Sequence, residues 1–245
     1  MREKMEEKNI TEVSVDLNVP TPYIESDSYL YKIKRSLTYR FSNNAIKRFF
    51  NKEDKISVLE IGTGSGFFLS FIHDEFPNAS LSGIEYDPRL LAVTKSRAPF
   101  AKCMNGNAEL FDFGDEKFDV IVSFQVIEHL YAPKEMLKRV YSHLKPNGVF
   151  VVTTPNLDGL GARIMGGKWH GHRDDHVSLK GYSQWKSLLL ESGFSEEYCG
   201  TTFFSGIPLL NRFPLGIFNW MLLVIFGAAR WKFGESFVGV FRRKD

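Results

Sequence analysis

The fold of this chain is decided by the stretch Val58-Leu-Glu-Ile-Gly-Thr-Gly-Ser-Gly66, in which an apolar run ends in a loop with glycine at every second position. A second apolar pattern with helical spacing, Phe67 to Ile72, follows at once. The order of strand, glycine-rich turn and helix is typical of the point where an α/β sheet binds a nucleotide. Only glycine lets the backbone turn sharply there and approach a ligand closely. The stretch therefore predicts an α/β nucleotide-binding fold.

The spacing of the glycines distinguishes between nucleotides. A dinucleotide fingerprint, G-x-G-x-x-G, would have its third glycine at position 67, where this chain has Phe67. Here the third glycine is Gly66, and Glu60 stands two residues before the first. The pattern E-x-G-x-G-x-G resembles motif I of the class I S-adenosylmethionine-dependent methyltransferases. A carboxylate suits that cofactor, because S-adenosylmethionine carries an ammonium and a sulfonium and no pyrophosphate. A loop that only turns the chain is the alternative for this motif taken alone.

The next motif is a second apolar strand, Leu81-Ser-Gly-Ile-Glu85, which ends in a carboxylate 23 residues after the first loop glycine. A carboxylate has two acceptor oxygens, so Glu85 is expected to accept both ribose hydroxyls. The resemblance implies that Tyr86 packs on the adenine face. Asp87-Pro88 opens the next helix, with the aspartate as its N-cap.

The third motif, Asn105-Gly-Asn107-Ala-Glu109, departs from the family at one position. The family has an aspartate where Asn107 stands, and that aspartate accepts a hydrogen bond from the adenine amino group. Asn107 still offers a carbonyl oxygen as acceptor. The resemblance implies that S-adenosyl-L-methionine is bound by Glu60, Gly62, Thr63, Gly64, Gly66, Glu85, Tyr86, Asn107, Ala108 and Phe124.

Two further segments, 118–130 and 144–156, complete five motifs in the order of the family. The near-continuous apolar run Phe118 to Phe124 is typical of a strand buried on both faces. The resemblance covers roughly positions 40 to 201. It is closest to the small-molecule branch that includes the ubiquinone- and menaquinone-pathway methyltransferases. It implies a Rossmann-like α/β fold: a seven-stranded mixed sheet with its last strand antiparallel and helices on both faces.

The chemistry of methyl transfer points to residues after the fourth strand. Transfer from a sulfonium is an in-line displacement, in which alignment and exclusion of water supply most of the rate. A base is needed only when the acceptor is a hydroxyl or an acidic carbon. His129 is the expected base, because its intrinsic pKa suits proton removal near neutral pH, and Glu128 stands beside it.

A substrate loop is expected over Lys168-Trp-His-Gly-His-Arg-Asp-Asp-His176, before a helix over 182–191. The resemblance gives His176 a place at the active site, because many relatives have a histidine there. The other two histidines, His170 and His172, are expected to be ordinary loop residues. Trp169 either walls the acceptor site or packs in the core.

A divalent cation is the competing interpretation of the same residues. Certain ubiquinone-pathway O-methyltransferases and the plant small-RNA 2′-O-methyltransferase carry E-x-x-E-H after the fourth strand and hold a cation there, and a later histidine contributes in the RNA enzyme. In this chain Gln125 replaces the first carboxylate. A hard cation such as Mg²⁺ favours charged oxygen ligands, and metal-free relatives keep Glu-His as well. The expectation is therefore a site without metal, although the metal alternative stays open.

The composition limits which classes of partner and which cellular compartment we expect. The 245 residues suffice for one domain with appendages, and 31 basic against 29 acidic residues argue against a general nucleic-acid binder. Cys103 and Cys199 stand in apolar contexts, which argues for a reducing compartment. The charged N-terminus lacks the apolar region of a secretory signal. We expect a cytoplasmic enzyme that methylates a small-molecule or lipid-like acceptor at oxygen and yields S-adenosyl-L-homocysteine. The alternatives are a protein or nucleic-acid methyltransferase, and a non-catalytic, membrane-peripheral module that binds the cofactor.

The chain is expected to divide into an N-terminal arm with a helical lid, 1–50, and a methyltransferase domain, 51–245. Apolar and aromatic residues recur at roughly helical spacing over 26–51, and family members use such a segment as a lid. Four of its side chains are candidates either to face a substrate or to pack and meet solvent: Tyr31, Arg35, Tyr39 and Arg40.

An uncharged segment of 17 residues, 213–229, lies between Arg212 and Arg230. A membrane-spanning helix needs about 20 apolar residues, and a single crossing would separate the expected last strand, 235–242, from its sheet. We therefore expect a hydrophobic helical insertion at about 205–231 that covers the active site, forms a homodimer face or makes peripheral contact with a membrane. Basic residues that would suit an anionic surface follow it: Arg230, Lys232, Arg242, Arg243 and Lys244.

Overall fold

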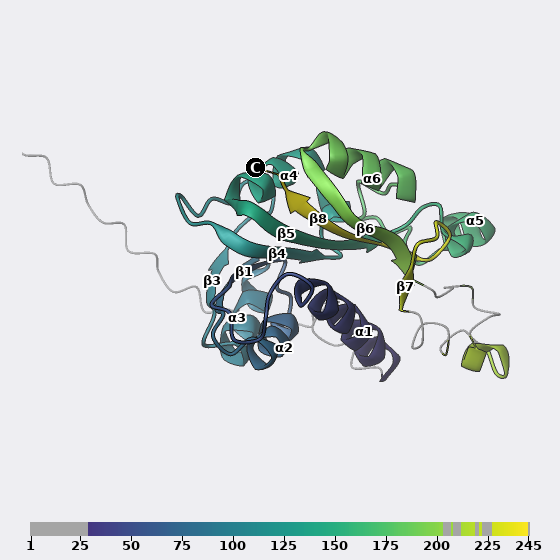
Figure 1. Cartoon of the computed structure of the whole chain (residues 1–245). Coiled ribbons are helices and arrows are strands. Elements are labelled where there is room, and N and C mark those ends of the chain that lie inside the picture. The colour runs from purple at the N-terminus through teal and green to yellow at the C-terminus, as the bar shows by residue number, and fades with distance from the viewer. Residues whose placement is uncertain (1–28, 203–206, 208–211, 219–220, 222–226, 245) are drawn as a thin grey trace, which may run out of the picture.

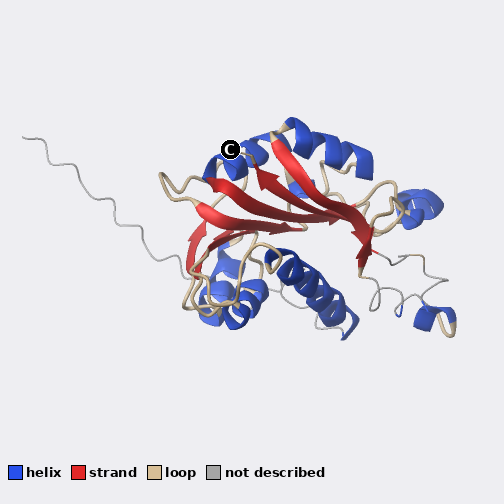
Figure 2. Cartoon of the chain, in the orientation of Figure 1, coloured by secondary structure: helices blue, strands red, loops and turns tan. Residues whose placement is uncertain are grey.

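The computed structural model describes residues 29–202, 207, 212–218, 221 and 227–244, with side chains from residue 36 onward (Figure 1). These residues form one eight-stranded mixed sheet with helices on both of its faces (Figure 2). The strand order is β3-β2-β1-β4-β5-β8-β6-β7. The strands are β1 (Ser57–Ile61), β2 (Ser80–Glu85), β3 (Lys102–Asn105), β4 (Phe118–Phe124), β5 (Leu144–Pro155), β6 (Phe194–Thr202), β7 (Ala228–Ala229) and β8 (Ser236–Arg243).

The helices form a layer on each side of the sheet. The α-helices are α1 (Tyr29–Ile46), α2 (Phe67–Glu75), α3 (Pro88–Arg97), α4 (Pro133–His143), α5 (Leu160–Met165) and α6 (Tyr182–Glu191). Two short 3-10 helices are η1 (Ile127–His129) and η2 (Gly166–Lys168). Helices α1, α2 and α3 lie against one face, whereas α4 and α6 cover the other (Figure 1).

The core follows the alternation of the strands. On β1, Val58 belongs to the cluster under α1 and α2, and its neighbour Leu59 belongs to the cluster under α4 and α6. Successive side chains of a strand point to opposite faces, so both faces of the central strands must be apolar to be buried. This requirement explains the near-continuous apolar run of β4, which was expected to be buried on both faces.

The topology places the loops that follow four strands at one edge. Strands β1, β2, β4 and β5 are parallel, so their carboxyl ends meet there. The chain runs from β1 outward through β2 to β3, then returns to β4 on the other side of β1. Such a reversal of strand order is where open α/β sheets bind ligands.

The predicted fold class is confirmed, with one difference in strand number. Strand β8 pairs antiparallel with β5, from Val149 opposite Arg242 to Pro155 opposite Ser236, as expected of the last strand. Seven strands were expected and the described residues form eight, because the two residues of β7 pair antiparallel with the end of β6. So short a strand has no periodic pattern in the sequence that would predict it.

Two of the basic residues near the C-terminus, Arg230 and Arg242, reach neighbouring residues of β6. Arg242 lies opposite the start of the paired part of β5, whereas Ser236 lies opposite its end. Arg242 lies 3.8 Å from Glu197 of β6, and the guanidinium of Arg230 lies 5.7 Å from the ring centre of Tyr198, the next residue along that strand. A shared anion-binding surface of the basic residues stays a prediction.

Most of the expected insertion at 205–231 lies outside the described residues. Within the described part, residues 215–218 are helical, and Phe213, Leu215 and Phe218 are exposed. None of the helices in the described residues is both long enough and apolar enough to span a bilayer.

Candidate active site

The loop after β1 has the backbone that its glycines predict. Gly62, Gly64 and Gly66 have φ values of 78°, 53° and 73°, in the left-handed region that side chains disfavour. The N–H groups of Gly62 and Thr63 donate to the carbonyl of Ile84 on β2, at 2.8 and 3.1 Å. No heavy atom lies within 4 Å of the position that a Cβ of Gly64 would take. The loop is therefore anchored on one side and open to a ligand at Gly64.

Two carboxyl groups, Glu60 and Glu85, lie buried beneath this loop. Glu85 accepts the N–H of Gly64 at 2.7 Å and the N–H of Asp87 at 3.0 Å. Glu60 is 2% exposed, and its Oε2 has no hydrogen-bond partner among the described residues. Burial, and then the charge of Glu85, raise the pKa of Glu60 well above its usual value; burial also raises the pKa of Glu85. An unpartnered buried oxygen of this kind fits a cationic group of a ligand.

The other predicted cofactor residues lie around the same strand ends. Tyr86 is exposed directly after β2, as a residue that covers an adenine would be. The side-chain oxygen of Asn107 accepts the N–H of Glu109 at 2.7 Å, which leaves one of its two lone pairs for a ligand. Ala108 is buried. The ring of Phe124, at the end of β4, packs edge-on against Phe68.

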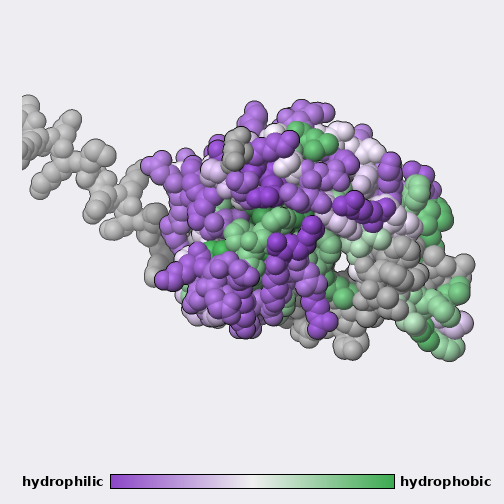
Figure 3. Space-filling view, in the orientation of Figure 1, coloured by the Kyte–Doolittle hydropathy of each residue, from purple (hydrophilic) through white to green (hydrophobic). Residues whose placement is uncertain are grey.

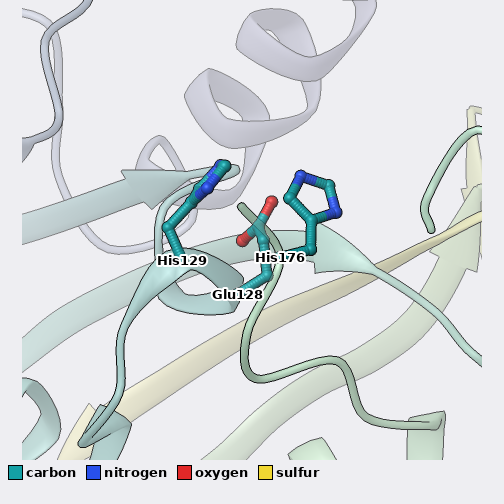
Figure 4. Close-up of side chains that lie close together, drawn as sticks. All are labelled: Glu128, His129 and His176. Carbon is teal, nitrogen blue, oxygen red and sulfur yellow. The ribbon is translucent and has the colours of Figure 1, made fainter. Parts of the chain in front are cut away.

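The three predicted catalytic residues lie together at the ends of β4 and β5. Glu128 and His129 lie on η1, and His176 comes from the loop before α6; the Glu128 carboxylate lies between the two imidazoles (Figure 4). One ligand atom from each residue lies within 4.8 Å of those of the other two. The loop is fastened to η1 because the N–H of Ser178 donates to the carbonyl of Glu128 at 2.9 Å.

Both histidines are oriented by backbone carbonyls. His129 Nδ1 lies 3.0 Å from the carbonyl oxygen of Asp175, and His176 Nδ1 lies 2.7 Å from that of Gly171. A carbonyl can only accept, so in both rings Nδ1 carries the hydrogen and Nε2 of the neutral ring keeps a lone pair. Each imidazole is thus prepared to take a proton or to coordinate a cation through Nε2.

The carboxyl group of Glu128 is electrostatically unusual. It is fully buried; Oε2 accepts the hydroxyl of Thr154 at 2.9 Å, and Oε1 has no partner among the described residues. Burial raises the pKa of Glu128 to about 8. Burial, together with the nearby His129, lowers the pKa of His176, so this ring favours the neutral form near neutral pH.

The cluster offers a divalent cation one ligand that the segment 125–129 does not contain. At Gln125, the amide nitrogen donates to the Thr153 hydroxyl at 3.3 Å. His176, however, supplies a third ligand beside Glu128 and His129. Two imidazoles and one carboxylate suit a transition ion better than Mg²⁺. The orphaned Oε1 of Glu128 would gain a partner from such an ion.

The remaining candidate residues whose side chains the structure describes divide into packed ones and exposed ones. Trp169 is fully buried and donates its indole N–H to Glu235 at 2.5 Å, so it is a core residue. His170 and His172 are exposed, as ordinary loop residues would be. The ring of Tyr39 packs on Phe68, Phe71 and Phe124, and Arg40 is exposed. The side chains of Tyr31 and Arg35 lie outside the described ones.

Three residues of the site carry no signal in the sequence. Thr154 holds Glu128, Asp175 supplies the carbonyl for His129, and the Thr94 hydroxyl donates to the carbonyl of Gly64 at 2.8 Å. Each acts from a segment that is 26 to 46 residues away from its partner in the sequence. Only the folded chain brings these pairs together.

The chain is similar in sequence to known methyltransferases. The profile of a methyltransferase domain family matches residues 31–197. A probable S-adenosylmethionine-dependent methyltransferase of Mycolicibacterium smegmatis is 36% identical over 99 residues, which cover 40% of this chain and 38% of the relative. A malonyl-[acyl-carrier protein] O-methyltransferase of Paenibacillus is 24% identical over 183 residues, which cover 68% and 66%. The chain thus spans between 38% and 66% of the length of these two curated relatives.

Solved structures share the fold. The plantazolicin methyltransferase BpumL, solved with S-adenosylhomocysteine, superimposes with a TM-score of 0.62 at 17% identity, over 89% of this chain and 87% of that one. A SAM-dependent methyltransferase of Thermotoga maritima gives 0.59 at 19% identity, over 89% and 96%. The family match extends over more than half of the 245 residues. The resemblance that the five motifs carry is therefore confirmed: this chain belongs to the methyltransferase domain family.

Proposed function

We propose that this chain transfers the methyl group of S-adenosyl-L-methionine to an oxygen atom of a small or lipid-like acceptor. One observation carries the proposal: a glycine loop with an open face and two imidazoles whose Nε2 atoms keep a lone pair lie at the same edge of the sheet. The two are linked by Val126, which stands two residues before Glu128 and whose Cγ2 fills the space that a Cβ of Gly62 would take.

The residues around the loop have distinct proposed roles toward the cofactor. The carboxylate of Glu60 pairs with its ammonium, since a buried, unpartnered oxygen is compensated best by a cation. Glu85 accepts the ribose hydroxyls with the lone pairs that Gly64 and Asp87 leave available. Tyr86 and Asn107 hold the adenine, by ring contact and through the amide oxygen. When bound, the cofactor supplies an electrophilic methyl group on its sulfonium.

On the acceptor side, we assign proton removal to His129. Its Nε2 bears the lone pair, and the carbonyl of Asp175 keeps the ring in that tautomer. The Asp175 carboxylate, 3.5 Å from Nδ1, stabilises the imidazolium after the proton has been taken. His176 packs edge-on against His129 at 4.6 Å between ring centroids and limits the access of water. Oxygen is favoured as the acceptor atom because a hydroxyl requires such a base, and the Paenibacillus relative is itself named for O-methylation.

A transition ion, if it binds, would be held by Glu128, His129 and His176 and would lower the pKa of an acceptor hydroxyl. Chelation separates this arrangement from the metal-free one. We expect transfer to persist after treatment with a chelator if His129 acts as the base. Loss of transfer that returns with Zn²⁺, Mn²⁺ or Co²⁺ would assign the cluster to a metal instead.

The first experiment incubates the chain and S-adenosylmethionine carrying a radiolabelled methyl group with a cell extract, and then partitions the products between organic solvent and water. Label in the organic phase supports a lipid-like acceptor. Label confined to the aqueous phase supports a soluble metabolite or a macromolecule. No transfer above a Gly64→Ala control contradicts the enzymatic proposal and favours a cofactor-binding module without turnover.

A second experiment tests the base. His129→Ala is expected to lower turnover by at least about a hundredfold, the lower range for a general base, and to leave cofactor affinity nearly unchanged. His172→Ala is the matched control, because that histidine is exposed in the neighbouring loop. If both variants lose activity alike, or if His129→Ala loses affinity as much as turnover, His129 is not the base.

A further inference from the structure

The short helix α5 turns apolar side chains outward. Leu160 and Ile164 are four residues apart and share one face of the helix, and Ile164 is 65% exposed. The opposite face is buried at Ala162, which is 6% exposed. Phe233, which is also exposed, lies beside the helix, with the guanidinium of Arg163 5.1 Å from the centre of its ring.

Buried hydrogen bonds hold this surface in place. The Glu235 carboxylate accepts the N–H of Gly161 at 3.1 Å and the indole N–H of Trp169 at 2.5 Å. The amide of Asn156 donates to two backbone carbonyls in the segment 232–234, each at 2.8 Å. Because the backbone beneath is fixed, the apolar side chains are presented to solvent by the fold itself.

A second group of exposed apolar residues lies at the same end of the molecule. Figure 3 shows hydrophobic side chains gathered there, over α5 and over the helical turn at 215–218. The members of this second group are Phe213, Leu215, Ile217, Phe218 and Met221. Together with Leu160, Ile164 and Phe233 they form what we call the apolar end. Large apolar side chains exposed together at one end of a molecule indicate an interaction site.

The charges around the apolar end are mostly positive, although the chain as a whole is nearly balanced. In the described segments 158–168 and 227–235, the exposed cations are Arg163, Lys168, Arg230 and Lys232. The two acidic residues there are Asp158, 3.6 Å from Arg163, and the buried Glu235. Arg212 adds a further exposed cation beside the second group. Apolar side chains bordered by cations complement a surface that has anionic headgroups above an apolar interior.

We propose that the apolar end binds the surface of an anionic lipid bilayer, with its apolar side chains entering the headgroup boundary and its cations facing lipid phosphates. Helix α5 follows β5 at the edge where Thr154 contacts Glu128, so the bilayer lies next to the candidate active site. An acceptor dissolved in that bilayer reaches the site without crossing water. This consequence for the acceptor rests on the proposed function, whereas the binding to lipid does not.

The test is flotation of the full chain with vesicles, without cofactor. Vesicles of phosphatidylcholine mixed with phosphatidylglycerol should carry the protein, and vesicles of phosphatidylcholine alone should carry much less. Ile164→Glu combined with Phe233→Glu should lower the partition coefficient by more than about tenfold, since two apolar side chains can no longer enter the boundary. Lys168→Gln and Lys232→Gln should each lower it by about fivefold.

The matched control is Leu190→Glu on α6, whose leucine is 42% exposed against 41% for Phe233. This variant should float like the unchanged chain. Its cofactor affinity, and that of the variants at Ile164, Phe233, Lys168 and Lys232, should stay the same, which shows that each is folded. Gly64→Ala should also float normally, so a failure of the methyl-transfer proposal leaves this result intact.

Three outcomes overturn the proposal. The first is no flotation of the unchanged chain with anionic vesicles. The second is equal binding to neutral vesicles, or equal loss of binding in the Leu190→Glu control. The third is a lipid-free dimer, seen by ultracentrifugation, that the double variant at Ile164 and Phe233 dissociates; the apolar end would then be covered by a second copy of the chain.

Discussion

At the scale of single residues, the most informative groups are two buried carboxyls, Glu60 and Glu128. Each has one oxygen without a partner among the described residues, and burial raises the pKa of both. Such groups destabilise a folded protein unless a ligand compensates them. Their positions, one beneath the glycine loop and one beside two imidazoles, indicate a cationic cofactor group for the first and a proton or a cation for the second.

Glu60 is expected to link cofactor binding to proton release. Its raised pKa favours the neutral carboxyl in the free protein, whereas a cofactor ammonium beside it favours the ionised form. Binding should therefore release up to about one proton and strengthen as pH rises toward the pKa of Glu60 in the free protein. Titration calorimetry in buffers of different ionisation enthalpy measures this release.

Two glutamate-to-glutamine variants provide the test and the control for that measurement. Glu60→Gln should bind the cofactor more weakly and release fewer protons. Glu75→Gln, in which an accessible carboxyl with a lowered pKa is replaced, should behave like the unchanged chain. Equal proton release by Glu60→Gln and the unchanged chain would show that the cofactor ammonium does not pair with Glu60.

Glu85 is expected to contribute through hydrogen bonds alone. Glu85→Ala should weaken cofactor binding by roughly 1.5–3 kcal/mol, the range for hydrogen bonds to a charged group. Asp87→Ala serves as the comparison, because that carboxylate caps α3 and pairs with Arg89. Cofactor affinity measured by calorimetry should fall for the first variant and stay within about twofold for the second; unchanged affinity in Glu85→Ala would refute the ribose assignment.

At the scale of elements, the turn between β1 and α2 combines anchoring with access. Gly62 is closed in by Val126 of the segment after β4, and Gly64 faces open space although its carbonyl is held by Thr94. The two glycines share a left-handed backbone and differ in what surrounds them. One glycine thus serves the packing of the fold and the other serves the approach of a ligand.

Alanine substitutions should separate these two roles. Gly64→Ala should cost about 1–2 kcal/mol of unfolding free energy, the penalty of a left-handed side chain, and should weaken cofactor binding strongly. Gly62→Ala should cost about 1–3 kcal/mol more, because its methyl group meets Val126 Cγ2. Urea unfolding and calorimetry measure the two effects. If Gly64→Ala binds the cofactor normally, the ligand does not approach the backbone there.

At the scale of the whole molecule, Glu235 joins parts of the chain that are distant in sequence. It lies directly before β8 and accepts the indole N–H of Trp169, from the loop between η2 and α6, and the N–H of Gly161 from α5. The loop that carries His176 and the helix of the apolar end are therefore fixed to the sheet by one buried carboxylate. Disturbing it should loosen the candidate site and the apolar end together.

Two tryptophan substitutions test this connection. Trp169→Phe removes a hydrogen bond to the buried carboxylate of Glu235 and should lower the unfolding free energy by about 1.5–3 kcal/mol beyond the packing loss. Trp185→Phe removes a bond of 3.2 Å to the neutral carbonyl of Pro155 and should lose about 0.5–1.5 kcal/mol beyond the same packing loss. Equal unfolding free energies by urea denaturation for the two variants would show that Glu235 is not the main group that fixes this loop and α5 to the sheet.

The sequence by itself determined what depends on local pattern. The glycines at 62, 64 and 66 require a left-handed turn, the apolar run of β4 requires burial on both faces, and Asp87 caps α3 through the N–H of Arg89. These features follow from steric limits on the backbone and from strand periodicity, which act within a few residues. The order of the motifs along the chain carried the resemblance to the family, and that resemblance implied the fold class and the antiparallel position of β8.

Only the tertiary structure decided what depends on distant pairs. It showed Trp169 in the core on Glu235, brought Thr154 to Glu128, and placed His176 beside His129 with both rings held by backbone carbonyls. It also added β7 to the sheet. The physical reason is that burial and hydrogen-bond partners are properties of the folded chain. Loops of similar composition acquire their roles only from the strands that they contact.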